Sequence, residues 1–280
     1  MHLKFITSLF LIALSVSSFC KEPTERQMIE NSADVVWHWV DEFSDLEKGK
    51  LKAWLIPTLE ATQKTLGTSP FDVHLHMHRK EKAKEPVPWA NTWRYPHQSI
   101  HFHVDPSYKL EAFLNDWTAP HEMSHLALPY LGEDHAWFAE GFASFMQAQV
   151  MRTMGIYTDE DVKNKYVSKV TKAMPLLDSP SPPAELFREL RKQHEYPAFY
   201  WGGATYFMRL HEMLKEKGSS GLPELVQRYM ECCRKGSRRL SDVLASWDRL
   251  LDSTACQSIF NEYSEQPCRN VVSKALADTY

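Results

Sequence analysis

The 280-residue sequence has no excess of basic residues, which binding to nucleic acid or to an anionic membrane surface would require. It contains 32 Lys and Arg against 36 Asp and Glu, and its formal net charge at pH 7 is -4. It also has no internal repeat and no low-complexity tract. Its composition, 43% hydrophobic and 24% charged, is typical of a globular protein with a sizeable core, in one large domain or two small ones. No nucleic-acid partner is therefore expected.

The apolar run at the N-terminus, Phe5–Val16, is too short to span a bilayer comfortably, and small residues follow it. This pattern predicts a secretory signal peptide over residues 1–20, with Lys21 as the first mature residue. The protein is then exported, periplasmic or secreted, with no stable membrane insertion after the signal is removed. The alternative is a lipoprotein anchored through Cys20. It is less favoured because Phe19 is bulky where a small residue is expected.

Few cysteines follow the predicted signal, and none of them forms a Cys-x-x-Cys pair, which argues against a metal site built from thiolates. The four are Cys232, Cys233, Cys256 and Cys268. An even number in an exported protein predicts two disulfides. Adjacent cysteines fit disulfide geometry poorly, so Cys232 and Cys233 are each expected to bond Cys256 or Cys268, in a pairing that stays open.

Two helices are predicted before the sheet, over residues 24–43 and 44–67, because apolar residues recur there with helical periodicity. Ser44 and Glu47 have the spacing of a capping box at the start of the second helix. Gly67 is expected to end it.

Two short alternating segments, residues 71–78 and 99–104, predict strands joined by a long loop over residues 79–95. From Asp105 onward almost the whole chain has the pattern of helices. Breaks are expected at Gly132, at Gly155 and at residues 178–183 and 217–221. The sequence thus predicts an α+β fold that is mixed at first and all-helical towards its end.

Histidines alternate along both predicted strands. His74, His76 and His78 share one face of the first strand, and His101 and His103 share one face of the second. A solvated polar face opposite the buried apolar residues is the favoured interpretation. The alternative is a second metal-binding patch.

The segment "HEMSH", from His121 to His125, has the His-Glu-x-x-His pattern of a catalytic zinc site. Two histidines four residues apart project from the same side of a helix and can converge on one ion. Glu122 then lies beside that side of the helix, placed to act on a water molecule. A zinc ion (Zn2+) is therefore the expected cofactor.

A catalytic zinc ion needs a third protein ligand and one open position. Glu140, within "WFAEGFA" from Trp137, is the candidate, on what is predicted to be a second helix. Aromatic residues surround it in the sequence, and a carboxylate among them needs a partner. Asp134 and His135 are the alternatives, although they fall in a loop.

These motifs resemble those of the gluzincin zinc metallopeptidases, especially the aminopeptidase-N-like and glycyl-aminopeptidase-like branches. "HEMSH", "WFAEGFA" and "YWGGATYF", which begins at Tyr200, carry the resemblance over roughly residues 100–215. It implies a zincin-like catalytic domain in which Tyr200 stabilises the transition state; a core role for Tyr200 is the alternative. The paired Gly202 and Gly203 indicate close backbone approach to the zinc helix or to substrate. No Gly-x-Met-Glu-Asn segment, which holds the substrate's amino group in the family, precedes the zinc motif.

The expected function is that of a secreted zinc metallopeptidase that hydrolyses peptides or proteins, with Glu122 as general base. Residues 21–155 are expected to hold the sheet and the zinc-binding helices, and residues 156–280 the helical remainder of the catalytic unit. One alternative is a non-catalytic, zinc-binding scaffold protein of the same fold. Another is a hydrolase of non-peptide amides or cell-wall material.

Overall fold

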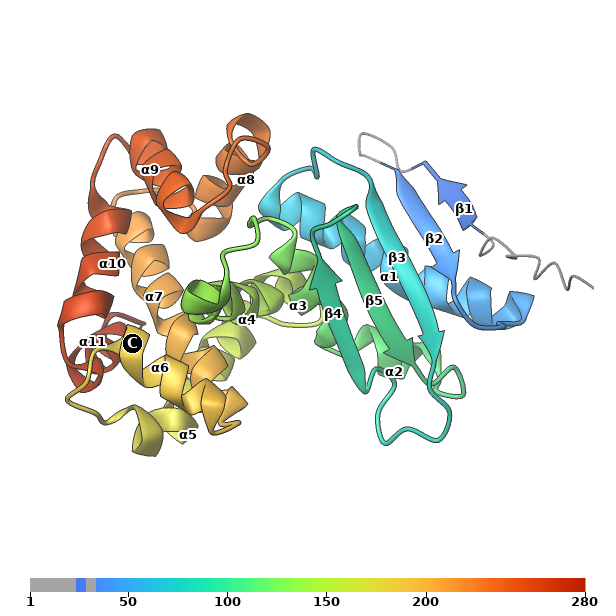
Figure 1. The fold of residues 1–280 in the computed structure, drawn as a ribbon, viewed down its shortest axis with the longest axis horizontal. Helices are drawn as coiled ribbons and strands as arrows, with labels where there is room; N and C mark the ends of the chain where they lie inside the picture. Colours follow the sequence, from blue (N-terminus) through green and yellow to red (C-terminus); the bar gives the residue numbers. More distant parts are fainter. Residues whose placement is uncertain (1–23, 29–33, 280) are drawn as a thin grey trace, which may run out of the picture.

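The computed structural model describes residues 24–28 and 34–279 (Figure 1). In this part of the chain a five-stranded sheet forms the N-terminal region and helices form the rest. None of the helices in these ranges has both the length and the hydropathy needed to cross a membrane. The predicted signal peptide, residues 1–20, lies outside the described residues, so export stays a prediction.

The sheet is mixed, with parallel strands at its centre and an antiparallel strand at each edge. The strands are β1 (Thr24–Gln27), β2 (Val35–Trp39), β3 (Val73–Arg79), β4 (Trp89–Trp93) and β5 (Ser99–Val104). They lie in the order β1-β2-β3-β5-β4, and β2, β3 and β5 run parallel. The register places His76 opposite both His38 and His101.

The prediction of a helix over residues 24–43 is wrong, because β1 and β2 form there. Trp37 and Trp39 of β2 are buried in the core, while His38 between them is half-buried on the opposite face. Alternation with a period of two is a strand pattern, and large aromatic residues favour strands. Val36, which lies on the same face as His38, adds an apolar residue that hides the alternation in the sequence.

The structure also has a strand, β4, inside the segment 79–95 that was predicted as a loop. Trp89 and Trp93 at its ends are 56% and 53% exposed. The strand is held by backbone pairing with β5. Because little of it is buried, no hydrophobic pattern marks it in the sequence.

Helix α1 (Asp45–Leu66) begins and ends as predicted. The Ser44 hydroxyl accepts a hydrogen bond from the Glu47 backbone, and the Glu47 carboxylate accepts one from the Ser44 backbone at 2.8 Å. At the other end of α1, Gly67 is the C-cap residue. The capping box predicted from the sequence is therefore confirmed.

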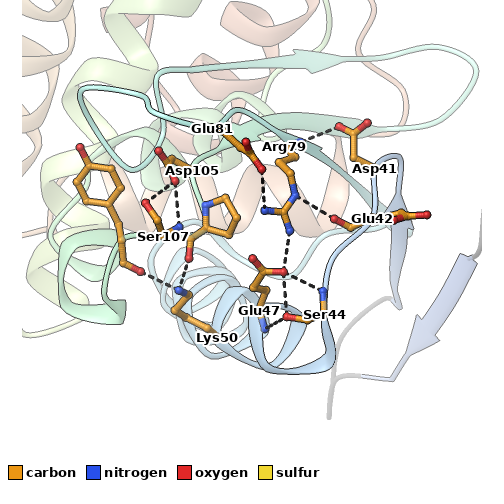
Figure 2. A network of polar contacts seen from close by, with 11 residues as sticks. Asp41, Glu42, Ser44, Glu47, Lys50, Arg79, Glu81, Asp105 and Ser107 are labelled. Atoms are coloured by element: carbon orange, nitrogen blue, oxygen red, sulfur yellow. Dashed lines mark hydrogen bonds and ion pairs between the residues drawn. The ribbon is translucent and has the colours of Figure 1, made fainter.

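The start of α1 is also tied to the end of β3 by Arg79 (Figure 2). Its guanidinium donates to Glu47 at 2.7 Å and to the Glu42 carbonyl at 3.0 Å, and its backbone N–H donates to Asp41 at 2.7 Å. Burial raises the pKa of Glu47, but the bonds from Arg79 and Ser44 outweigh it and hold that pKa below its usual value. This network joins the helix layer to the sheet at one corner.

One face of the sheet packs against α1 and the short helix α2 (Leu110–Leu114), which lie behind the sheet in Figure 1. Trp54 of α1 contacts Phe102 of β5 and Phe113 of α2, with ring centroids 5.3 and 4.9 Å apart. All three side chains are fully buried. The opposite face of the sheet carries the histidines.

The rest of the described chain is helical, as predicted from Asp105 onward. The elements are α3 (Thr118–His125), the 3-10 helix η1 (Glu133–His135), α4 (Ala136–Thr153), α5 (Asp159–Leu177), α6 (Pro183–Lys192), α7 (Tyr196–Glu216), α8 (Leu222–Cys232), α9 (Leu240–Leu251), α10 (Ala255–Glu265) and α11 (Cys268–Thr279). The predicted breaks fall between these elements. The division of the chain at residue 155 stays a prediction.

Helices α4 and α7 form the centre of the helical part. Aromatic side chains fill the space around them: the Trp137 ring lies parallel to that of Tyr263, with centroids 5.9 Å apart, and the Phe138 ring lies 4.7 Å from that of Phe207. All four residues are buried. This core anchors α4, which carries Glu140, and α7, which carries Tyr200.

The backbones of α4 and α7 touch where Gly141 faces Gly203. A Cβ atom added to Gly141 would lie 2.3 Å from the carbonyl carbon of Gly203, and one added to Gly203 would lie 2.3 Å from the Trp137 carbonyl oxygen. The sequence predicted a close approach at Gly202 and Gly203. The neighbour at Gly203 is the helix that carries Glu140, whereas the expected neighbours were the His-Glu-x-x-His helix or substrate.

The prediction of disulfides from Cys232 and Cys233 to Cys256 and Cys268 is wrong. The structure joins Cys232 to Cys233, whose Cα atoms are 3.7 Å apart, and leaves Cys256 and Cys268 free and buried. The two free thiols are fully buried parts of α10 and α11, whereas the bridged pair is at the end of α8. Burial raises the pKa of Cys256 and of Cys268, which keeps both thiols protonated and unreactive.

Replacement of Gly203 by Ala is expected to lower the free energy of unfolding by about 1–3 kcal/mol, because the added methyl group overpacks a backbone contact. The matched control is Gly49→Ala in α1, where a Cβ meets no atom within 4 Å. That change is expected to raise stability by about 0.5–1 kcal/mol, since Ala favours the interior of a helix. Urea unfolding measures both. Equal effects of the two substitutions would contradict the role of the α4–α7 contact.

Candidate functional site

His121 and His125 lie on the same side of α3, one helical turn apart. Their ring centroids are 4.9 Å apart, and the residues are 3% and 8% exposed. Helix α3 is buried along its whole length and packs against α1, α4 and the edge strand β4. The two imidazoles are therefore held between the sheet and the helical part.

Glu140 of α4 meets these two histidines. Its Oε2 atom lies 3.2 Å from His121 Nε2 and 3.5 Å from His125 Nε2. One ligand atom from each of the three residues lies within 4.8 Å of the other two. Among the residues described, this is the only group of three or more His, Cys, Asp or Glu side chains found in a metal-binding arrangement.

Asp134 and His135, the alternatives for a third ligand, do not join this group. Both belong to η1, in the connection between α3 and α4. The His135 ring contacts Phe260, with centroids 6.2 Å apart. Of the three candidates, the structure brings only Glu140 to the two histidines.

A further residue of α4, Gln147, orients the His121 ring. Its Oε1 atom lies 3.0 Å from His121 Nδ1. A carbonyl oxygen can only accept, so Nδ1 donates to Gln147 and Nε2 is the nitrogen that faces Glu140. Such a partner fixes the ring and tautomer of a metal-binding histidine. Gln147 lies seven residues after Glu140, and its role was not predicted from the sequence.

The electrostatic state of the group suits metal binding. Burial raises the pKa of Glu140, but His125 and His121 outweigh it and hold that pKa well below its usual value. Burial lowers the pKa of His121, but its hydrogen bond to Glu140 more than compensates and leaves that pKa raised. The carboxylate is thus fully ionised, as a metal ligand must be.

Glu122 is held by a residue that the sequence analysis also missed, Thr92 of β4. The Thr92 hydroxyl donates to Glu122 Oε2 at 2.6 Å and also faces the Glu122 backbone oxygen, a second acceptor, at 3.0 Å. Glu122 itself is 9% exposed. Thr92 could have been predicted to lie near Glu122 only if β4 had been recognised as a strand, and no sequence pattern marks β4.

The end of α3 is fixed by a second residue next to β4, Arg94. It donates to the backbone oxygens of His125 and of Leu128, the latter at 3.1 Å. The His125 oxygen also accepts from the Leu128 N–H at 3.1 Å and the Leu128 oxygen from Arg234 at 3.0 Å, so Arg94 adds a second donor to each carbonyl group at this helix end. The hydrogen bond from Arg94 to the backbone of His125 thus helps to hold this residue in position.

Tyr200 of α7 is half-buried, and its ring centroid lies 5.9 Å from that of His121. Burial raises the pKa of Tyr200, and the nearby carboxylates of Glu140 and Glu122 raise it further. The phenol therefore stays protonated and can donate a hydrogen bond at neutral pH.

One cavity of about 430 Å³ contains all five of these predicted site residues. Its lining includes His121, Glu122, His125, Glu140 and Tyr200. Strand β4, α3, the loop before η1, α4 and α7 form its walls. Residues far apart in the sequence thus supply one concave site of a size typical for ligand binding.

The histidines of the sheet lie on the face opposite the core, as predicted, but they are half-buried. His76 stacks between His38 and His101, with ring centroids 4.1 Å away on each side. Burial and the neighbouring histidines lower the pKa of His74 and of His101 to about 4. These rings are therefore neutral at pH 7.

Comparisons by sequence identify no relative: no family model matches the chain, and no curated protein does. Comparison of structures identifies several. An aminopeptidase N family protein from Idiomarina loihiensis superposes with a TM-score of 0.59 at 15% identity, over 88% of this chain and 47% of that one. An M1 zinc metallopeptidase from Deinococcus radiodurans gives a TM-score of 0.55 at 13% identity, over 88% of this chain and 52% of that one.

A variant of the Deinococcus radiodurans protein, bound to a Tyr-Ser-Ala substrate, matches with a TM-score of 0.53 at 14% identity. The chain spans about half the length of these structures, 47% to 52%. At such low identity the likeness establishes the fold alone. The fold is that of part of an M1 zinc metallopeptidase, a mixed arrangement of a small sheet and many helices.

Substitution of Glu140 by Ala is expected to remove most of the bound zinc, because two imidazoles alone make a weaker site than two imidazoles and a carboxylate. Glu133→Ala is the matched control, since Glu133 lines the same cavity but binds Arg191 and Tyr130. Elemental analysis of both purified variants measures the metal. Full zinc in Glu140→Ala would contradict the assignment of the third ligand.

Proposed function

We propose that this chain is a zinc-dependent metallopeptidase that hydrolyses peptide bonds. The convergence of His121, His125 and Glu140 beside the Glu122 carboxylate, in one cavity, carries the proposal. The fold shared with M1 zinc metallopeptidases supports it. The resemblance of the three sequence motifs to gluzincin metallopeptidases points the same way.

The donor set fits zinc and leaves room for catalysis. Two imidazole nitrogens and one carboxylate oxygen are the ligands of many catalytic zinc sites, which keep a fourth position open. The Nε2 atoms of His121 and His125 both face the same Glu140 oxygen, so the three donors converge. A bound zinc ion lowers the pKa of water towards 7 and polarises the scissile carbonyl group.

Glu122 acts as the general base in this proposal. It takes the proton of the attacking water and delivers it to the leaving amine. The Thr92 hydroxyl holds Glu122 Oε2, which fixes the carboxylate and leaves Oε1 for proton transfer. Thr92 is thus a positioning residue.

Tyr200 stabilises the transition state by a hydrogen bond from its phenol to the developing oxyanion. Two features support this role: Tyr200 lines the cavity beside His121, and its raised pKa keeps the proton on the phenol. The Gly141–Gly203 contact fixes α7 against α4, so the tyrosine and Glu140 keep their relative position.

The substrate is a peptide bound in extended form along β4. This strand is at the edge of the sheet, and Trp89, Asn91 and Thr92 line the cavity. An unpaired strand edge binds an extended peptide through main-chain hydrogen bonds. No acidic residue occurs in β4, and of the two lining carboxylates other than those of Glu122 and Glu140, Glu133 is paired with Arg191 and Glu85 precedes the strand. We therefore propose that cleavage is not limited to the N-terminal bond.

Incubation of the zinc-loaded protein with a mixed peptide library is expected to give internal cuts, mapped by mass spectrometry. Glu122→Gln is the matched control. It is expected to keep its zinc and to lose hydrolysis by roughly a hundredfold or more, since it removes only the base. Turnover of Glu122→Gln close to that of the unchanged protein would reject Glu122 as the base. Cuts confined to N-terminal bonds would reject the proposed specificity.

Thr92→Val keeps the shape of the side chain and removes its hydroxyl. We expect kcat to fall about tenfold or more, because a hydrogen bond to a charged group contributes about 1.5–3 kcal/mol. Thr92→Ser retains the hydroxyl and is expected to restore most of the rate with unchanged zinc content. Equal rates in the Val and Ser variants would show that the bond to Glu122 is irrelevant to catalysis.

Tyr200→Phe is expected to leave zinc content and melting temperature unchanged and to lower kcat about a hundredfold to a thousandfold, the usual cost of losing one oxyanion donor. Tyr196→Phe, one turn earlier on α7, is the control, because the Tyr196 hydroxyl bonds His194 outside the cavity. Zinc, melting and kcat are measured on the same preparation. A lower melting temperature with normal kcat would instead assign Tyr200 to the core.

A further inference from the structure

One face of the sheet is rich in histidine and is not covered by any helix that the structure describes. We name it the histidine face. It comprises His38 of β2, His74, His76 and His78 of β3, and His101 and His103 of β5. Helices α1 and α2 lie against the opposite face (Figure 1). Six of the 13 histidines in the chain are therefore gathered here, and none of them lines the cavity that holds Glu122.

The rings of the histidine face form ordered stacks. His76 is parallel to His38 within 2° and to His101 within 8°. The His78 ring lies 4.5 Å from that of His103 at an angle of 10°. Each ring is half-buried between its neighbours, which restricts its rotamer.

Two pairs of nitrogen atoms meet across neighbouring strands within this face. His38 Nε2 lies 2.9 Å from His74 Nδ1, and His78 Nε2 lies 3.1 Å from His101 Nδ1. In each pair one ring donates a proton and the other accepts it. The backbones that carry these rings are the central, parallel strands of the sheet, which are fixed by the core on the other side.

We propose that the histidine face binds divalent transition-metal ions, with copper(II) held most tightly, at two sites: one between His38 and His74, the other between His78 and His101. Binding requires the donating ring of each pair to lose that proton to solvent and take one up at its other nitrogen, and both rings to tilt so that their lone pairs turn from each other towards one ion. Water completes the coordination.

The separations within the pairs suit this metal. A metal–imidazole bond is about 2.0–2.1 Å long, so nitrogens 2.9 and 3.1 Å apart subtend about 90° and about 98° at a shared ion. These angles are close to those of the square-planar or tetragonal geometry that copper(II) and nickel(II) prefer. Among divalent ions of the first transition series, copper(II) also binds nitrogen ligands most strongly.

Charged groups of both signs act on the rings of the histidine face. Arg26 is paired with Asp34 and Asp72, so its charge is offset at the β1–β2 edge. Lys80 and Asp41 act on His103 in opposite directions, and burial, His78 and Lys80 together leave the pKa of His103 lowered. Burial and neighbouring histidines lower the pKa of His74 and of His101, one ring of each pair, so these two rings are neutral at pH 7, as binding to a metal requires.

The test is a titration of the full, zinc-loaded protein with copper(II) sulfate at pH 7. We expect two copper ions per chain with zinc retained, measured together by elemental analysis after desalting, and nitrogen hyperfine splitting in the electron paramagnetic resonance spectrum. His74→Gln and His78→Gln are each expected to lose one copper ion, and the double variant to lose both. His103→Gln is the matched control, since its ring stacks on the same face outside both pairs, and it is expected to bind two.

Three results would overturn the proposal: copper bound only in exchange for zinc, copper retained in the double variant, or copper lost equally in His103→Gln. Melting temperatures of all variants exclude misfolding as the cause of a loss. Peptide hydrolysis is expected to be the same in every variant, because none of these residues lines the catalytic cavity. Since the readout is bound copper, failure of the proposed peptidase function would leave the result of this test unaffected.

Discussion

The contact between Gly141 and Gly203 determines how the candidate site is assembled. Because neither residue has a side chain, the backbones of α4 and α7 touch directly. Glu140 precedes this contact on α4, and Tyr200 precedes it by one helical turn on α7. The proposed metal ligand and the proposed oxyanion donor therefore approach α3 from two helices that are in direct backbone contact. A methyl group at either glycine would separate them, and sites of this kind tolerate little displacement.

The candidate site concentrates polar groups where the surrounding structure is apolar. Glu140 follows the buried aromatic residues Trp137 and Phe138 on α4, yet its side chain remains 28% exposed towards the cavity. A carboxylate in such a place is costly unless cationic partners or a metal compensate it. Here Glu140 faces both imidazoles, the amide of Gln147 holds His121 and the hydroxyl of Thr92 holds Glu122, so each predicted polar side chain on α3 has a partner. The arrangement supports the proposed binding of a cation.

The sheet serves two separate purposes on its two faces. The core face, with Trp37, Leu75 and Phe102, packs on α1 and fixes the strands. The histidine face takes its order from that packing, because cross-strand neighbours on a rigid sheet keep constant spacing. The edge strand β4 contributes Thr92 to the wall of the cavity, where its hydroxyl binds Glu122. Strand register thus controls both the histidine pairs and the position of Glu122.

The sequence by itself determined the features that depend on residues close together in the chain. The spacing of His121 and His125, the capping box at Ser44 and the helical nature of the C-terminal part all follow from the geometry of a single helix. Tertiary structure decided the rest. Strands β1, β2 and β4, the meeting of Glu140 with the histidines, the support from Thr92 and Gln147, and the state of the cysteines depend on contacts between distant segments. Such contacts are set by which surfaces become buried together, and no local pattern of residues encodes that choice.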